Sequence, residues 1–463
     1  MSHRNITLEA MRQEVFDAKP GLANIINENR AKSLMAYRYQ PNSDRVSGLR
    51  KNELLETVRS LATRLFGGVI ADTINKQLSE QWYVSTAEHH GPVSHPFVVG
   101  GTFVASLMNQ RQGRNTAIIF STSNVSLNNS SFPRGFVFHT PALAEVRLSL
   151  QPGKYRQNPV ASLPKIKSDA YADLVVQIRK YNSNLGEKFI QWQEKLMEVD
   201  TYVEQVSILN ELFWRCLPGQ ENMHLIYLSQ EAIVSSLLTK YHLEKNTELH
   251  ELIFNNSWRL SYKCFFNGLV GAFSDDGRRG TFLFWAIRDG HRFGLSLEGD
   301  ELVSIDRSYR LRLLPETIAT ALKNGELLPS MALTFIVLSC YYGLLCGGGF
   351  SQVDYLPKIQ IAYQAMLNDL GVSIANEKTE IPFLSSDYAF ISLQTGDKQV
   401  LATGLDLALY GNDETFNRLT SLAETTTVSQ ALDNLIPKLY TIVGGKKNVF
   451  PFINAAMPSC LYV

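Results

Sequence analysis

Apolar residues recur every three or four positions over several long stretches of the chain, which is the spacing of an amphipathic helix. One such stretch in the N-terminal part reads ELLETVRSLATRLFGG and ends at Gly67 and Gly68. Further stretches lie between about residues 168 and 256, and at 414–423 and 427–438. The pattern predicts a protein made mainly of helices.

Continuous apolar runs of strand length interrupt this helical pattern in two places. Between residues 115 and 150 they read NTAIIFST, RGFVFHT and LAEVRLSL. Between 281 and 297 the runs TFLFWAI and HRFGLSL flank Asp289 and Gly290, a dipeptide typical of a hairpin turn. We therefore expect an α+β fold, predominantly helical, with short mixed or antiparallel sheets at about 115–150 and 280–298.

One apolar stretch without charge, Leu327 to Val353, is long enough to be considered as a membrane span. Glycines interrupt it and its flanks are not basic, so we expect a buried helix at 329–346 instead. The order of the patterns suggests an N-terminal α+β region at 1–165, a helical region at 166–260 and an α+β region at 261–463. Because no long linker separates these regions, one continuous core is the alternative.

The composition is that of a globular protein, with 45% hydrophobic and 19% charged residues among 463. Basic and acidic residues balance at 44 each, so net charge gives no general attraction to nucleic acid or an anionic membrane. The five cysteines form no CxxC pair, and the first residues lack the apolar core of a signal peptide. We expect free thiols, a cytoplasmic location and a small molecule as partner, with the oligomeric state open.

The densest chemical signal is the segment STAEHHGPVSHP, which places three of the nine histidines and a glutamate within eight residues. Imidazole is the commonest metal ligand in proteins, and a carboxylate often completes the ligand set. A divalent metal such as iron or zinc could be held by these side chains together with a later histidine, namely by Glu88, His90, His95 and His139. His89 would then serve as an acid or base.

Two other interpretations of the same segment stay open. No HExxH or other defined ligand spacing is present, so a metal-free enzyme is an alternative, with His89 or His90 as the base of an acyl or group transfer. The segment could also be a structural loop whose histidines only make hydrogen bonds. In an extended segment, Glu88 and His90 would point to one side and His89 to the other.

A second polar loop, SNVSLNNSSFPRG, follows the first predicted strand. We expect Asn128 and Asn129 to orient a substrate and Arg134 to bind its negative group, because a guanidinium matches a carboxylate or phosphate with two hydrogen bonds. The alternative is a turn-rich loop that carries a surface arginine.

Three consecutive glycines in GLLCGGGFSQVDYL form a third feature. The pattern favours a helix stop, with Gly347 just past the helix end, over a phosphate cradle, because it matches no defined phosphate-binding motif. The polar residues that follow at once, including Gln352 and Tyr355, are candidates for lining a substrate pocket.

Together these observations favour an enzyme that acts on a small polar or anionic substrate at a histidine-rich site. The expected catalytic residues are His89, His90 and Arg134. The alternative from another class is a helical interaction or effector protein without catalysis, in which the helices at about 170–256 and 410–440 carry the contact surface.

Overall fold

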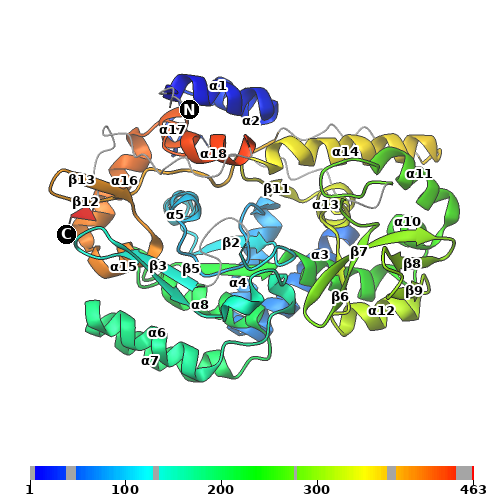
Figure 1. Ribbon diagram of the computed structural model, residues 1–463, viewed down its shortest axis with the longest axis horizontal. Helices are drawn as coiled ribbons and strands as arrows, with labels where there is room; N and C mark the ends of the chain where they lie inside the picture. Colours follow the sequence, from blue (N-terminus) through cyan, green and yellow to red (C-terminus); the bar gives the residue numbers. More distant parts are fainter. Residues whose placement is uncertain are drawn as a thin grey trace.

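A computed structural model of the chain describes residues 6–37, 48–128, 135–275, 279–372, 382–444 and 461–462. It contains 54% helix and 17% strand, which confirms the predominantly helical α+β class. The strands form several sheets, including one parallel sheet and a curled antiparallel sheet. Figure 1 shows that these two sheets lie side by side, with helices around them.

The parallel sheet has the strand order β11-β1-β2-β5. Its strands are β1 (Tyr83–Ser85), β2 (Thr116–Ser121), β5 (His224–Ser229) and β11 (Leu345–Gly347). Along the chain the sheet grows from β1 through β2 to β5, and then continues on the other side of β1 with β11. The strand order thus reverses between β1 and β11, and each of the three regions suggested by the sequence contributes at least one strand.

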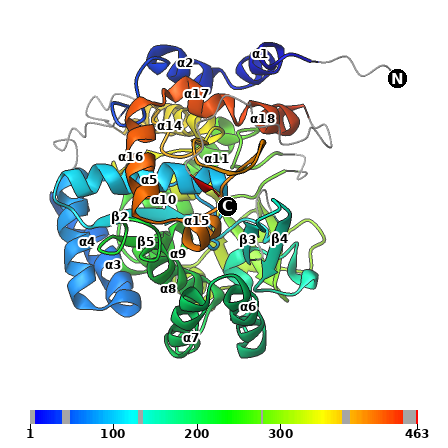
Figure 2. The same ribbon diagram turned by 90° about the vertical axis from the view of Figure 1, so that its left-hand side faces the viewer.

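Alternate residues of the central strand β2 enter two different hydrophobic cores, because successive side chains of a strand point to opposite faces. Ala117 and Ile119 pack with helices α5 (Pro96–Arg111) and α8 (Tyr202–Trp214). Ile118 and Phe120 pack with the helices of the other core, which are α3 (Gly48–Phe66), α4 (Gly68–Gln81) and α9 (Gln230–Leu237). Figure 2 shows α5 crossing one face of the sheet. Both faces are therefore covered, as in other parallel sheets.

The expected sheets at 115–150 and 280–298 are both present, but the first is divided. Only β2 joins the parallel sheet, while the two later runs pair with each other as a separate hairpin, β3 (Gly135–His139) and β4 (Glu145–Ser149). The second region forms an antiparallel sheet with the order β10-β6-β7-β8-β9. Its strands are β6 (Phe284–Arg288), β7 (His291–Glu298), β8 (Glu301–Ser304), β9 (Arg310–Arg312) and β10 (Leu327–Pro329).

The long apolar stretch is buried, as expected, but its helix is shorter than predicted. A short helix, α13 (Met331–Phe335), continues as the π-helix η5 (Ile336–Tyr341), after which the chain turns into strand β11. Gly343, with φ of 57°, lies in the turn, and Gly347 belongs to the strand, so the helix-stop interpretation of Gly347 is wrong. No helix within the described ranges is long and apolar enough to cross a membrane.

The other elements surround these sheets. Figure 1 shows α1, α2, α17 and α18 gathered along one side of the molecule, and the pair α6 and α7 on the opposite side. The helices not yet named are α1 (Leu8–Ala18), α2 (Pro20–Asn29), α6 (Ser168–Tyr181), α7 (Ser183–Met197), α10 (Glu248–Phe254), α11 (Asn256–Phe266), α12 (Pro315–Lys323), α14 (Gln352–Asp369), α15 (Gly404–Tyr410), α16 (Asp413–Thr425), α17 (Val428–Asp433) and α18 (Ile436–Val443). Short 3-10 or π segments are η2 (Gly153–Tyr155), η3 (Val160–Ser162) and η4 (Leu238–His242), and the last small sheet joins β12 (Ser392–Thr395), β13 (Lys398–Leu401) and β14 (Leu461–Tyr462).

Candidate functional site

A pocket of about 700 Å³ lies at the carboxyl edge of the parallel sheet, and we call it the sheet-edge pocket. Residues that follow each of the four strands line it, and they come from segments 86–95, 122–126, 230–231 and 349–352. The antiparallel sheet closes another side with Trp285 and Arg292. In open parallel sheets, ligands bind outside the carboxyl ends of the strands, where the strand order reverses, and this pocket occupies that position.

The histidine segment enters the pocket as an extended continuation of β1. The His90 amide donates to the carbonyl of Thr122 at 2.8 Å, and the Thr122 amide donates to the carbonyl of Glu88 at 2.9 Å. As expected for an extended segment, Glu88 and His90 are both buried, at 1% exposure each, whereas His89 between them is exposed. The segment is held in place by Gln230 and Gln352, whose side-chain amides donate to the backbone and hydroxyl of Thr86.

His90 borders the pocket, but both of its ring nitrogens are engaged by the protein. Nε2 lies 2.8 Å from the carbonyl oxygen of Val203, and Nδ1 lies 2.7 Å from the hydroxyl of Ser121. Since a carbonyl can only accept, Nε2 carries the proton and the Ser121 hydroxyl donates to Nδ1. Burial lowers the pKa of His90 to about 4. His90 is therefore a neutral residue that positions the segment, rather than the base that the sequence suggested.

The other two histidines of the segment line the pocket directly. His95 caps helix α5 by accepting the amide of Phe97 on Nδ1 at 3.2 Å. Burial, with smaller contributions from the nearby Lys438 and His89, lowers the pKa of His95 to about 3. His95 is thus neutral at physiological pH, while His89 presents an exposed imidazole to the pocket.

Glu88 faces a different pocket, between α5 and β2, and lines no part of the sheet-edge pocket. Its Oε2 accepts from the hydroxyl of Ser85 at 2.6 Å. Burial, with a smaller contribution from the neighbouring Asp387, raises the pKa of the Glu88 carboxyl to about 7 against the opposing effect of the Ser85 hydrogen bond.

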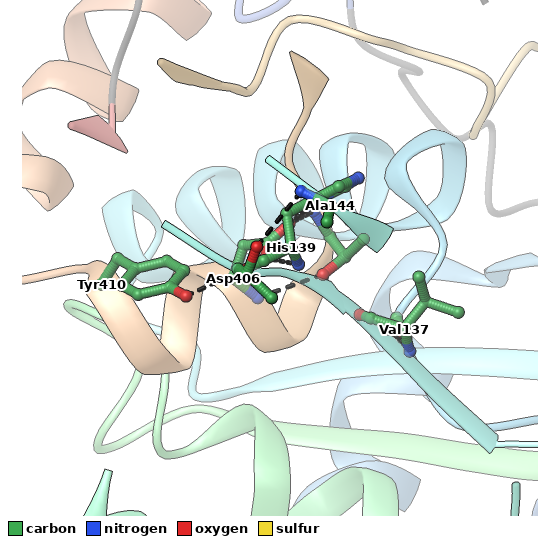
Figure 3. Close-up of polar contacts among 8 residues, drawn as sticks. Val137, His139, Ala144, Asp406 and Tyr410 are labelled. Atoms are coloured by element: carbon green, nitrogen blue, oxygen red, sulfur yellow. Dashed lines mark hydrogen bonds and ion pairs between the residues drawn. The ribbon is translucent and has the colours of Figure 1, made fainter. Parts of the chain in front are cut away.

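His139 is part of a structural contact between β3 and α15, which Figure 3 shows. Its Nδ1 donates to Oδ2 of Asp406 at 2.8 Å, and its backbone amide donates to Oδ1 at 2.7 Å. The hydroxyl of Tyr410 donates to the His139 carbonyl at 2.7 Å. Asp406 is fully buried, so this contact fixes the helix onto the hairpin.

The four predicted metal ligands, Glu88, His90, His95 and His139, are therefore not brought together. Among the residues that the structure describes, no group of three or more His, Cys, Asp or Glu side chains is arranged to hold a metal ion. The iron or zinc site expected from the sequence does not fit these four residues.

The polar loop after β2 contributes a different asparagine from the ones expected. Asn128 is exposed and lines no part of the pocket, whereas Asn124 is buried and does line it. Asn129 and Arg134 lie outside the described residues. Gln352 and Tyr355, the other two expected substrate-binding residues, both line the pocket.

The loop after β2 is organised by a buried carboxylate that the sequence did not single out. Glu231, at the start of α9, accepts the backbone amides of Ser123 and Asn124 at 2.8 and 3.2 Å. The hydroxyls of Thr122, Ser123 and Ser229 also donate to it, at 2.8, 2.8 and 3.1 Å. Because these donors engage both oxygens, Glu231 shapes the pocket wall and is not an available base.

A guanidinium does face the pocket, but it belongs to Arg292 in the hairpin strand β7. Its Nη1 lies 3.1 Å from Oδ1 of Asn124 and also donates to the carbonyl of that residue. The guanidinium carbon stacks over the ring of Trp285 at 4.2 Å. Lys438 of α18 adds a second cation to the lining. Spacing in the sequence could not identify either residue, because Arg292 lies 168 positions from Asn124 and Lys438 lies still further from His95.

Asp387 supplies the pocket with a carboxylate in an unusual backbone conformation. Its φ is 68°, a left-handed value that is uncommon outside glycine. Oδ2 accepts the amide of Phe350 at 2.7 Å, and burial raises the pKa of Asp387 to about 6. Backbone strain and a shifted pKa of this kind cluster at functional sites.

The glycines at 347–349 allow the chain to pack closely against residues 385–387. They do not form a phosphate cradle. A Cβ on Gly347 would lie 2.7 Å from Cβ of Ser385, and one on Gly349 would lie 2.7 Å from Oδ2 of Asp387. The position where a phosphate could meet the loop is thus occupied by the protein's own carboxylate.

No protein-family model matches the chain, and no curated protein matches it in sequence.

Proposed function

We propose that this protein is an enzyme that acts on a small anionic substrate bound in the sheet-edge pocket. The observation that carries the proposal is the convergence of the segments after four parallel strands on one pocket at the point where the strand order reverses. A volume of about 700 Å³ is within the range of small-molecule sites.

The charges around the pocket favour an anion. Arg292 and Lys438 both line it, whereas the carboxylates of the lining already accept hydrogen bonds, Glu231 from five donors and Asp387 from the amide of Phe350. Phe335, Phe350 and Trp285 line the same space, so a substrate with an apolar or aromatic part beside its negative group suits the pocket.

Proton transfer is assigned to Asp387 and His89. A carboxyl group with a pKa of about 6 is close to the ideal value for an acid or base near neutral pH. His89 offers an exposed imidazole in the same lining. These two groups suit an acyl or group transfer without a metal. A cytoplasmic location for this activity remains a prediction from the cysteines.

The first test is binding, with benzoate and phenyl phosphate as probes and benzyl alcohol as the neutral control. Isothermal titration should give saturable binding of at least one anion and much weaker binding of the alcohol. Equal binding of the alcohol, or no saturable binding of either anion, would contradict the anionic substrate.

The second test is catalysis on esters and thioesters of the acid that binds, followed by chromatography. Asp387→Asn and His89→Ala should each reduce turnover by about 100-fold while the anion still binds, because an acid or base contributes on the order of 10²–10⁴ to the rate. His291→Ala, in the exposed part of β7, is the matched control and should leave turnover unchanged. If the two pocket variants keep full turnover, the assigned acid–base roles are wrong.

Two controls address the alternatives. Full activity in a preparation free of iron and zinc would support the metal-free version, whereas loss on chelation and recovery with one metal would support the metal-dependent one. If pocket substitutions leave the biological activity intact while substitutions on the exposed faces of α6, α7 and α16 abolish it, the interaction-protein alternative is favoured.

A further inference from the structure

A second pocket, of about 120 Å³, runs along β2 beneath helix α5, and we call it the α5 pocket. It shares no lining residue with the sheet-edge pocket. At the amino end of β2 it is bordered by Gln77, whose amide donates to the carbonyl of Thr116 at 3.1 Å. At the carboxyl end it is bordered by Glu88. None of the described residues that line it is a lysine, arginine or histidine.

The Glu88 carboxyl is held in this pocket with one oxygen left over. Oε2 accepts from the Ser85 hydroxyl at 2.6 Å, and Ser85 lies 2.8 Å from the hydroxyl of Ser385, which can donate to it in turn. Oε1 is buried and makes no hydrogen bond of regular geometry with the described residues, although the nearby amides of Glu88 and Ala87 lower the pKa of the carboxyl. Burying a carboxylate oxygen without a donor is costly, so the place of Glu88 in the lining of this pocket points to a missing partner.

Aromatic side chains surround the same space. Tyr37, Tyr83, Phe383 and Tyr388 all line the α5 pocket, and they come from three separate segments of the chain. The rings of Tyr37 and Phe383 stack with their centroids 4.9 Å apart, and Tyr83 meets Phe383 edge-on at 5.7 Å. Several aromatic rings with one carboxylate are the arrangement by which proteins recognise ammonium groups.

We propose that the α5 pocket binds a small ammonium group, as a primary or methylated amine, with Oε1 of Glu88 as its counter-ion and the four aromatic side chains as its walls. The absence of a basic side chain among the described lining residues leaves the carboxylate for an outside cation. The volume of about 120 Å³ limits the ligand to a compact group and excludes a nucleotide or other large cofactor.

The charge state of Glu88 makes this binding depend on pH. The titratable groups around Glu88 are Tyr83, Tyr227 and Asp387, together with Tyr37 and Tyr388 of the lining. With a pKa of about 7, Glu88 is mostly protonated at pH 6 and mostly ionised at pH 8. Since a cation prefers the ionised form, its affinity should rise about tenfold between these two pH values.

The test is a titration of the full chain with tetramethylammonium chloride at pH 8, followed by ligand-observed NMR or calorimetry. The neutral control is tert-butanol, and potassium chloride at equal ionic strength is the salt control. Saturable binding of tetramethylammonium that tert-butanol does not share supports the proposal. Equal binding of tert-butanol, or no saturable binding because the pocket holds only water, overturns it.

Two pocket variants and one control test whether tetramethylammonium binds in the α5 pocket. Glu88→Gln removes the charge with little change of shape and should weaken binding at least tenfold. Ala105→Leu fills the pocket, leaves Glu88 in place and should weaken binding as much. Glu14→Gln, on the exposed face of α1, is the matched control and should bind like the wild type. Unchanged affinity in both pocket variants, with thermal melts that show folded protein, overturns the site.

Discussion

At the residue scale, the polar side chains that look most reactive in the sequence serve three different purposes. His90 and His139 use their ring nitrogens in buried hydrogen bonds, Glu88 faces the α5 pocket, and His89 and His95 face the sheet-edge pocket. The type of residue gives the chemistry that a side chain can perform. Its partners, which come from distant parts of the chain, decide whether it is available to perform it.

Replacing Asp406 by alanine should destabilise the protein strongly. The change removes a fully buried carboxylate that accepts from His139 and from the amide of Thr403, and it leaves those donors without partners. Leaving a buried donor without a partner costs about 1–3 kcal/mol, and three such donors are left here. Urea denaturation measures the loss. Asp397→Ala, at an exposed hairpin turn, is the control, and a similar loss in both variants would contradict the structural role of Asp406.

The neutral state of His90 predicts a loss of stability in acid. The imidazole has a pKa of about 4 in the folded protein and an ordinary value near 6.5 in the unfolded chain. The unfolded chain therefore binds more protons between these pH values, so the free energy of unfolding falls as the pH is lowered from 6.5 to 4. His90 should contribute about 1–3 kcal/mol to that fall.

The measurement is urea denaturation at several pH values for the wild type and for His90→Gln. The variant has no titrating ring at this position, so its stability should fall less steeply in acid. His291→Gln, with an exposed ring, is expected to follow the wild type. Parallel curves for His90→Gln and the wild type would show that His90 does not carry this pH dependence.

At the element scale, helix α5 contributes residues to the lining of both pockets. Its backbone packs directly against the segment at 385–388, which also lines both. A Cβ on Gly100 would overlap the carbonyl oxygen of Tyr388, and one on Gly101 would lie 2.8 Å from Cα of Ser386. Glycine is unfavourable within a helix, so two adjacent glycines in α5 are explained by this contact rather than by helix formation. The same segment carries Ser385 to the α5 pocket and Asp387 to the sheet-edge pocket.

Two glycine-to-alanine substitutions should therefore differ in their effect on the stability of the protein. Gly100→Ala should destabilise the protein by about 1–3 kcal/mol or more, because overpacking a rigid backbone contact forces the helix and segment apart. Gly68→Ala, in the first turn of α4 with nothing near the added methyl, should be neutral or stabilise by up to about 1 kcal/mol. Thermal and urea denaturation measure both, and equal effects would contradict the close packing of α5.

At the scale of the whole molecule, the sheet-edge pocket is formed where the parallel sheet meets the antiparallel sheet. Arg292 of the antiparallel sheet donates to Asn124, which follows a strand of the parallel sheet. Lys438 reaches the same space from α18, close to the C-terminal end of the described chain. The two cations proposed for substrate binding thus depend on the packing of units that are distant in sequence.

A charge series at Arg292 tests this arrangement. Arg292→Ala should weaken benzoate binding at least tenfold. Arg292→Lys should recover only part of the affinity. A lysine keeps the charge but loses the planar group that stacks on Trp285 and can bind an anion through two hydrogen bonds. Arg310→Ala, in a surface ion pair of β9, is the control. Full affinity in Arg292→Ala would place the anion elsewhere.

The sequence by itself determined the elements, because their signals are local. The helical spacing, the buried strand TAIIFS, the hairpin at Asp289 and Gly290, and the alternation of Glu88, His89 and His90 are all encoded by neighbouring residues and appear in the structure. Only the tertiary structure decided the order of the parallel strands and which side chains share a pocket. Asp387, Arg292 and Lys438 come together through contacts between remote segments, and backbone packing, not residue spacing, brings them there.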